Sequence, residues 1–213
     1  MLLDCHTHHP APQPQAVVCA SPVGFEPIEG QIYSLGIHPW NPEEATEENF
    51  EALLRLGALP EVVAIGEAGV DTVKGGPMYK QIMSFKRQIQ ISEQLGKPLI
   101  VHDVKAHDII IGLRHDYAPK QPWIIHGFRS KPSVVEMLLR ASARFYFSFG
   151  EHFNPGSLTA VPADHLLAET DDSPLSIENI IANISDALGR DITGQIAHNT
   201  EKILGVKVLG FQY

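Results

Sequence analysis

The sequence predicts an α/β protein whose strands close into a compact (β/α)8, or TIM, barrel of a distorted or shortened kind. Short apolar runs alternate with segments of helical periodicity along most of the chain, which indicates a parallel sheet. Eight of these runs are strand candidates, and that number favours a closed barrel over an open sheet. The 213 residues suit one domain, 1–213, near the lower size limit of such a barrel.

The first part of the chain is expected to supply four strands and one helix. The second strand is reached through the proline-rich segment 10–14, which leaves no room for a helix before it. Glu43–Leu56 has helical periodicity, with Pro42 before it and acidic residues in its first turn. The four expected strands are Leu2–Cys5, Ala16–Cys19, Gln31–Leu35 and Val62–Ile65.

The rest of the chain is expected to supply four more strands with helices between and after them. Met78–Leu95 is helical and is stopped by Gly96 and Pro98. The expected strands are Leu99–Val101, Trp123–Ile125, Phe145–Ser148 and Leu166–Ala168. The other expected helices are His107–Tyr117, Ser133–Ala141, Ile177–Leu188 and Thr193–Leu204.

Composition limits the classes of protein that this chain fits. It has 25 acidic and 16 basic residues, a net charge of −9, so a diffuse basic surface for nucleic acid is absent. Cys5 and Cys19 form no disulfide framework, and we expect buried, reduced thiols in a cytoplasmic protein. We expect no secretory signal and no membrane span, because the chain lacks apolar stretches of sufficient length.

Six potential metal ligands stand at or just after the ends of apolar runs. In a parallel barrel the C-terminal strand ends surround one cavity, so ligands far apart in sequence would meet there. Each ligand alone is more often an ordinary capping or loop residue, but six in this arrangement favour a functional site. The six are His6, His8, Glu67, His102, His126 and Asp171.

The spacing of the first motif, Asp4–His8, suits chelation of one divalent metal. Side chains alternate along a strand, so His6 and His8 are expected on one face, with Cys5 and Thr7 on the other. Asp4 would share the histidine face and orient one imidazole. Neutral imidazoles suit zinc, manganese or iron.

Charge counting predicts a positive centre within this acidic protein. The carboxylate of Glu67 has two oxygens and can bridge two cations, while glycines on either side allow close approach. Two divalent ions bring +4 and the two carboxylates of Glu67 and Asp171 bring −2, about +2 in total. Such a centre would attract a phosphate and activate hydroxide for hydrolysis.

These motifs resemble those of the TatD-like family of metal-dependent deoxyribonucleases, a branch of the amidohydrolase-like TIM barrels. The matching segments run through most of the chain, and Asn199 in the last helix also resembles the family. They are Asp4–His8, Leu35–Pro39, Ala64–Asp71, Pro98–His102, Ile125–Phe128 and Leu166–Pro174.

The resemblance implies a two-metal site and hydrolysis of phosphodiester bonds in DNA, from the 3′ end of single strands. Glu67 would bridge the metals, and Asp171 would take a proton from the attacking water, which makes these two the catalytic residues. His38 would lie near the substrate phosphate or behind the metal ligands. The implied ligand sets are His6, His8, Glu67 and Asp171 for one ion, and Glu67, His102 and His126 for the other.

Several further residues follow strand ends and have two open interpretations. Arg129, Lys131 and Lys105 are candidate phosphate contacts, or solvated surface cations. Trp40 and Phe128 are candidates for stacking on a base, although packing in the core or at the rim is the commoner use.

The leading hypothesis is a metal-dependent hydrolase, a phosphodiesterase or deoxyribonuclease that acts through a hydroxide activated by two metals. The ions would be zinc, manganese or magnesium, and the substrate DNA or a small phosphoester, with no membrane and no obligate protein partner. One alternative is a hydrolase of small esters, lactones or amides, because the same ligands activate water for any electrophile. Another is a non-catalytic metal-binding protein, against which the retention of all six ligands argues.

Overall fold

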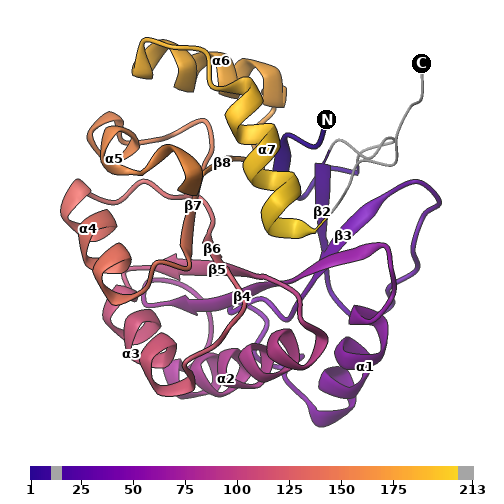
Figure 1. Ribbon diagram of the computed structural model, residues 1–213. Helices are drawn as coiled ribbons and strands as arrows, with labels where there is room; N and C mark the ends of the chain where they lie inside the picture. The colour runs from indigo at the N-terminus through magenta and orange to yellow at the C-terminus, as the bar shows by residue number, and fades with distance from the viewer. Residues whose placement is uncertain (11–15, 206–213) are drawn as a thin grey trace.

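The computed structural model describes residues 1–10 and 16–205 and contains a closed barrel of eight parallel strands in chain order (Figure 1). Each strand pairs with the next, and β8 closes the barrel on β1 where Ala168 lies beside Asp4. The predicted barrel is therefore confirmed. The strands are β1 (Asp4–Thr7), β2 (Ala16–Ala20), β3 (Ile32–Leu35), β4 (Val62–Asp71), β5 (Leu99–Val104), β6 (Trp123–Ile125), β7 (Phe145–Phe149) and β8 (Leu166–Ala168).

Helices lie around the barrel, as Figure 1 shows. Along the chain they occur between β3 and β8 and after β8. Residues 21–31, between β2 and β3, contain no helix. Neither do residues 8–10 after β1, and most of the proline-rich segment lies outside the described residues. The barrel is thus shortened, as expected. The helices are α1 (Glu47–Gly57), α2 (Met78–Leu95), α3 (His107–Tyr117), α4 (Pro132–Ala141), α5 (Pro155–Ala160), α6 (Ile177–Leu188) and α7 (Thr193–Leu204), with a 3-10 turn η1 (Ala163–His165).

Three strands differ from the predicted apolar runs by two or more residues at an end, and three others, β2, β3 and β7, differ by one residue. The first run was expected over Leu2–Cys5, whereas β1 begins and ends two residues later. β4 and β5 continue well past their apolar runs and stay paired, with Gly69 beside His102 and Asp71 beside Val104. Glu67 and His102 consequently lie inside strands, as His6 does in β1. The prediction that these three residues follow strand ends was wrong. The polar side chains of Glu67 and His102 are satisfied by one another inside the barrel, so the backbone pairing need not stop.

Two helical predictions also needed correction. α1 begins at Glu47 rather than at Glu43, because the side chain of Thr46 accepts a hydrogen bond from the backbone N–H of Asn49 and caps the helix there. The short helix α5 was missed. It begins at Pro155 after the capping residue Asn154, and a helix of less than two turns is too short to show helical periodicity in the sequence.

Bulges in β1 and β4 set the direction of the site residues. Between the paired positions Asp4–Ala16 and Thr7–Val18, β1 has one residue more than β2, the signature of a β-bulge. The simple alternation expected for this strand therefore fails. Cys5 does not point away but belongs to the inner apolar cluster and donates its S–H to the Ser148 hydroxyl over 3.0 Å.

The core has two layers that follow the alternation of the strands. A small cluster lies among the inward side chains, including Val17, Ile100 and Leu167. A larger cluster, with Phe85, Trp123 and Phe147, packs the strands against the helices. This packed scaffold supports the C-terminal ends of the strands, where the polar residues gather. None of the helices in residues 1–10 and 16–205 has the length and hydropathy of a membrane span.

Candidate metal centre

The carboxylate of Glu67 lies at the centre of a ring of imidazoles. It is buried on β4, and nitrogens of five histidines approach its two oxygens. Two of the histidines approach one oxygen and three the other. At Oε2 the distances are 3.4 Å to His6 Nε2 and 3.4 Å to His8 Nε2. At Oε1 they are 2.9 Å to His38 Nε2, 2.5 Å to His102 Nδ1 and 2.7 Å to His126 Nε2.

Asp171 joins the Oε2 side of this centre. Its Oδ1 lies 3.7 Å from His6 Nε2 and 3.5 Å from His8 Nε2. Asp171 was predicted at the end of β8, but it lies three residues past that end. Its backbone donates to the His6 carbonyl and accepts from the His8 N–H, so the end of β1 positions it.

The Oε1 side brings together His102 of β5 and His126, which directly follows β6. His126 Nε2 and His102 Nδ1 are 3.3 Å apart. His38, from the loop after β3, completes this side through its contact with Glu67. The loop is clamped by Gln88 of α2, which accepts from the Ile37 N–H and donates to the Ile37 carbonyl, each over 2.9 Å.

The site favours a charged carboxylate among charged or metal-bound imidazoles. Burial opposes ionisation of Glu67, but the charge of His126 and hydrogen bonds from the surrounding histidines hold its pKa well below the usual range. Burial likewise opposes the charge of His126, yet Glu67 and Glu169 raise its pKa well above normal. The hydrogen bond to Glu67 raises the pKa of His8.

Glu169 supports His126 from behind, and the sequence analysis missed it. It is fully buried; its Oε1 accepts from the Gly127 N–H over 2.5 Å and lies 3.5 Å from His126 Nδ1. Burial disfavours its charge, but the contact with His126 keeps its pKa below normal. An acid directly after the last apolar run, two residues before Asp171, was the available signal.

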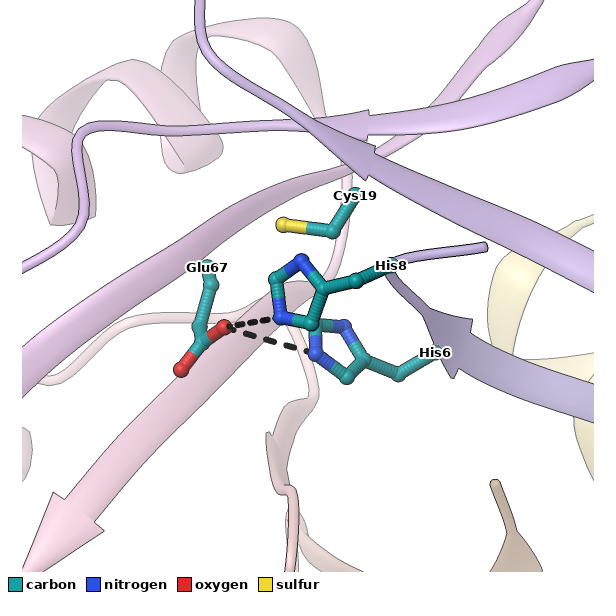
Figure 2. Close-up of side chains that lie close together, drawn as sticks. All are labelled: His6, His8, Cys19 and Glu67. Atoms are coloured by element: carbon teal, nitrogen blue, oxygen red, sulfur yellow. Dashed lines mark ion pairs between the residues drawn. The ribbon is translucent and has the colours of Figure 1, made fainter. Parts of the chain in front are cut away.

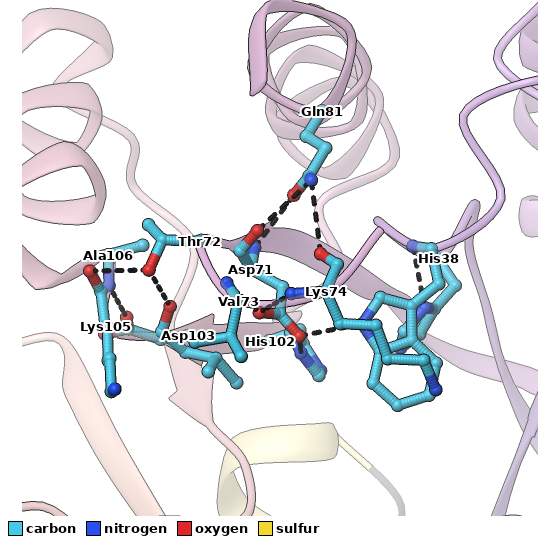
Figure 3. A network of polar contacts seen from close by, with 12 residues as sticks. His38, Asp71, Thr72, Val73, Lys74, Gln81, His102, Asp103, Lys105 and Ala106 are labelled. Carbon is cyan, nitrogen blue, oxygen red and sulfur yellow. Dashed lines mark hydrogen bonds and ion pairs between the residues drawn. The ribbon is translucent and has the colours of Figure 1, made fainter. Parts of the chain in front are cut away.

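Asp71 plays the same part for His102, at the far end of β4 (Figure 3). Its Oδ2 lies 3.3 Å from His102 Nε2 and accepts from the Trp40 indole N–H over 2.7 Å. Although desolvation opposes its ionisation, the bond from Trp40 and the N–H groups of Lys74 and Val73 lower the pKa of Asp71. Carboxylates placed behind histidines in this way fix the orientation of metal-binding rings.

Asp4 has another role than the predicted one. Rather than orienting an imidazole, it accepts from the His6 N–H over 3.3 Å and from the N–H and hydroxyl of Thr170 over 3.1 and 2.6 Å. It ties β1 to the segment after β8. Burial raises the pKa of Asp4 to about 7.

Cys19 of β2 is a member of the centre that the sequence analysis did not include (Figure 2). Its sulfur and ligand atoms of His6, His8 and Glu67 all lie within 4.8 Å of one another. Part of the residue is exposed, contrary to the expected full burial. The surroundings of the sulfur nevertheless desolvate the thiolate and raise the pKa of Cys19 to about 12.

A cavity of about 480 Å³ opens over the centre. Its lining includes His8, His38, Asp171 and the candidate phosphate contacts Lys105 and Arg129. Trp40, 40% exposed, forms part of the rim, and the ammonium of Lys74 lies 3.2 Å from the centre of its ring. Phe128 is buried against Phe147 and Phe149, so packing is its use.

The donor set fits divalent metals. His6 is fully buried, and neither of its ring nitrogens has a hydrogen-bond partner among residues 1–10 and 16–205. Such groups are rare unless an ion or water satisfies them. Imidazole and carboxylate donors suit zinc, manganese and related ions. All six predicted ligands occur in three groups of residues, and within each group the ligand atoms lie within 4.8 Å of one another. The groups are His6, His8, Cys19 and Glu67; His6, His126 and Asp171; and His38, Glu67 and His102.

The family follows from a comparison with known proteins. The family model described as TatD related DNase matches residues 26–203. The chain belongs to this family. The TatD resemblance stated from the motifs is thereby confirmed.

Individual TatD-family proteins are similar to this chain over parts of their length. The 3′-5′ ssDNA/RNA exonuclease TatD of Erwinia billingiae is 30% identical over 145 residues, which cover 64% of this chain and 55% of that protein. The uncharacterized metal-dependent hydrolase YabD of Bacillus subtilis is 31% identical over 150 residues, which cover 66% and 58%. The chain thus matches little more than half the length of these curated relatives.

A solved TatD-family structure shows the same fold. The crystal structure of YJJV, a TatD homologue from Escherichia coli, superposes with a TM-score of 0.81 at 19% identity and covers 96% of this chain and 98% of its own. The two structures therefore share the barrel fold over nearly the whole of both chains.

Proposed function

We propose that residues 1–213 form one metal-dependent hydrolase domain that binds two divalent ions and cleaves phosphodiester bonds. One observation carries the proposal: the buried carboxylate of Glu67 has two imidazoles at one oxygen and three at the other. A carboxylate so surrounded has the donors on each side that a bridging ligand of two cations requires.

The proposed ligand sets follow the two oxygens. His6, His8 and Asp171 would hold one ion with Glu67, and His102 and His126 would hold the other. When bound, the ions would supply Lewis acidity that activates water and stabilises a phosphate. Zinc and manganese suit these donors better than magnesium, which prefers oxygen ligands.

Asp171 is the proposed proton acceptor. Its Oδ1 belongs to the metal group, yet the side chain is 33% exposed and lines the cavity. A carboxylate in this position can take the proton of an attacking water and pass it to solvent. Glu67 is too deeply buried for that role, and it would hold the two halves of the site together.

The substrate proposed is single-stranded DNA, cleaved from its 3′ end, or a smaller phosphoester. The name of the Erwinia relative supports it, and the exposed side chains of Lys105 and Arg129 stand beside the cavity. These cations and His38 would contact phosphate oxygens. The protein as a whole is acidic and would not attract DNA, so the attraction would come from the positive charges at the site.

The test is hydrolysis of 3′-labelled single-stranded DNA with magnesium, manganese or zinc added in turn. We expect metal-dependent cleavage by the native protein and a loss of at least about 10³-fold in the Asp171→Asn variant. Asp116→Asn is the matched control, because Asp116 is 69% exposed on α3 and forms an ion pair with the exposed His115. It should cleave like the native protein.

The outcomes separate the alternative functions. Cleavage that Asp171→Asn retains would overturn the proposed proton acceptor. A protein that holds metal but cleaves no DNA would overturn DNA as the substrate, and small phosphoesters, lactones and amides would be assayed next. Turnover of none of these would leave metal binding as the function.

A further inference from the structure

Cys19 is placed among the metal ligands by the pairing of β2. The strand lies between β1 and β3, with Val18 beside Thr7 and Cys19 itself beside Ser34. Val17, two residues earlier on the same face, belongs to the inner cluster. The Cys19 side chain therefore points into the barrel, one step above the inner core, where His6 and His8 enter from β1.

The sulfur is near enough to share an ion with its neighbours. It and ligand atoms of His6, His8 and Glu67 lie within 4.8 Å of one another. Figure 2 shows the sulfur directed to the same space as the two imidazoles and the carboxylate. Metal–nitrogen and metal–sulfur bonds are about 2.0–2.3 Å long, so ligands of one ion lie up to about 4.5 Å apart, which is close to the spacing of these four atoms.

A second observation points to a ligand in this space. The imidazole of His6 is fully buried, and within the described part of the chain both of its nitrogens are without a hydrogen-bond partner. Its nearest carboxylate oxygens, on Glu67 and Asp171, are 3.4 and 3.7 Å away. An ion between these groups would satisfy Nε2 of the ring, and it would lie on the same side of Glu67 as Cys19.

We propose that Cys19 supplies a thiolate ligand to the ion held by His6, His8 and Glu67, and that it makes this position selective for zinc over magnesium. On binding, the metal–sulfur bond replaces the S–H bond, and the proton leaves to solvent. Thiolate is a soft ligand that favours zinc and cobalt, whereas magnesium requires oxygen ligands. The inference rests on the proposed metal centre and adds a ligand and a metal preference to it.

Cys5 provides a matched control within the same barrel. It is also a buried free thiol near the site, one residue before His6. Its sulfur, however, donates to Ser148 in the inner cluster and belongs to none of the metal groups found in the described residues. Substitution of either cysteine removes one thiol from the inside of the barrel. Only substitution of Cys19 also removes a proposed metal ligand.

The experiment is titration of the metal-free full chain with cobalt(II), followed by absorption spectroscopy. We expect visible ligand-field bands together with a near-ultraviolet sulfur-to-cobalt charge-transfer band. Cys19→Ser should keep the visible bands and lose the charge-transfer band, and Cys5→Ala should keep both. Cys19→Ala, with circular dichroism of every variant, separates the loss of a ligand from a failure to fold.

Metal affinities provide the second readout. The affinity of Cys19→Ser for zinc should be at least about tenfold lower than that of the native protein. Loss of a residue that only hydrogen-bonds to a metal ligand already costs about tenfold, so loss of a ligand should cost no less. Magnesium affinity should change by less than about twofold, because sulfur is a poor ligand for it. Equal losses for both ions would overturn the proposed selectivity.

The spectra also distinguish the two proposals. Ligand-field bands without a charge-transfer band in the native protein would overturn the role of Cys19 and leave the metal centre standing. If no cobalt binds to the folded protein, the metal centre fails and the Cys19 proposal fails with it. Neither result depends on hydrolytic activity.

Discussion

At the scale of single residues, the histidines of the centre are held by carboxylates behind them. Glu169 lies behind His126, and Asp71 lies behind His102. An acid in this position fixes which ring nitrogen faces the metal and increases the basicity of the ring. The orientation of the ligands is thus set before a metal arrives.

Neutralising Glu169 should weaken metal binding while leaving the fold intact. In Glu169→Gln the amide keeps the shape but loses the charge opposite His126, so affinity for zinc should fall by about 10–100-fold. A chromophoric chelator in competition measures it. Glu93→Gln is the control, since Glu93 also accepts backbone N–H bonds, from Lys120 and Gln121, on the outside of the barrel. Equal affinities for both variants would contradict the prediction.

His107 should make stability depend on pH. Its Nδ1 lies 2.6 Å from Asp103 Oδ2 at the start of α3, and this hydrogen bond raises the pKa of His107 above 6.5. A raised pKa in the folded state means that the pair stabilises fully below pH 6.5 and loses its effect as the pH rises through the folded value.

Unfolding of the native protein and His107→Gln at several pH values tests this. In acid, the free energy of unfolding of the native protein should exceed that of the variant by about 1 kcal/mol. This difference should shrink towards alkaline pH. A difference that grows with pH would contradict the sign.

At the scale of secondary structure, β4 is the element that centres the site. Between the pairs Ile65–Leu99 and Ala68–Val101 it has one residue more than β5, and the bulge contains Gly66 and Glu67. Gly66 has φ +122°, and a β-carbon there would meet the backbone carbonyl of Ile100. Only glycine fits, and the bulge directs Glu67 into the barrel.

Gly66→Ala should destabilise the protein strongly. Backbone strain and overpacking against β5 together predict a loss of about 2–4 kcal/mol in the free energy of unfolding, measured by urea denaturation. Gly112→Ala is the control: Gly112 lies in α3, and a β-carbon there meets nothing within 4 Å. That variant should be more stable by about 0.5–1 kcal/mol, so the two substitutions should have opposite signs.

At the scale of the whole molecule, the proposed ions would hold the barrel closed. The predicted ligands come from β1, β4, β5, the end of β6 and the segment after β8. A ligand that binds only the folded state stabilises it by mass action. The centre should therefore contribute to the stability of the complete barrel and not only to catalysis.

Chelation should accordingly lower the melting temperature. At a metal concentration about 100 times Kd, binding adds about 2.7 kcal/mol, which for a chain of this size is a shift of about 5–10 °C. Differential scanning calorimetry with and without EDTA measures it. Glu67→Gln should show almost no response to EDTA, and an equal response in this variant would place the stabilising ion elsewhere.

Much of the fold could be predicted because its signals are local. Met78–Leu95, Trp123–Ile125 and Leu166–Ala168 have the predicted bounds, since apolar periodicity and stop signals lie within each segment. The extensions of β4 and β5 could not be predicted, because the polar end of each strand is held by pairing with the other strand. No signal within either segment indicates this pairing. The bulge in β1 likewise depends on its pairing with β2.

The sequence by itself determined the barrel, the family and the six side chains that meet at its centre, because each depends on residue type and on the short apolar run beside it. Tertiary structure alone decided which groups surround those six. Glu169 stands behind His126, Asp71 behind His102, and Cys19 beside His6. The physical reason is that closure and register bring these pairs together across different strands, and no local pattern in the chain encodes their separation.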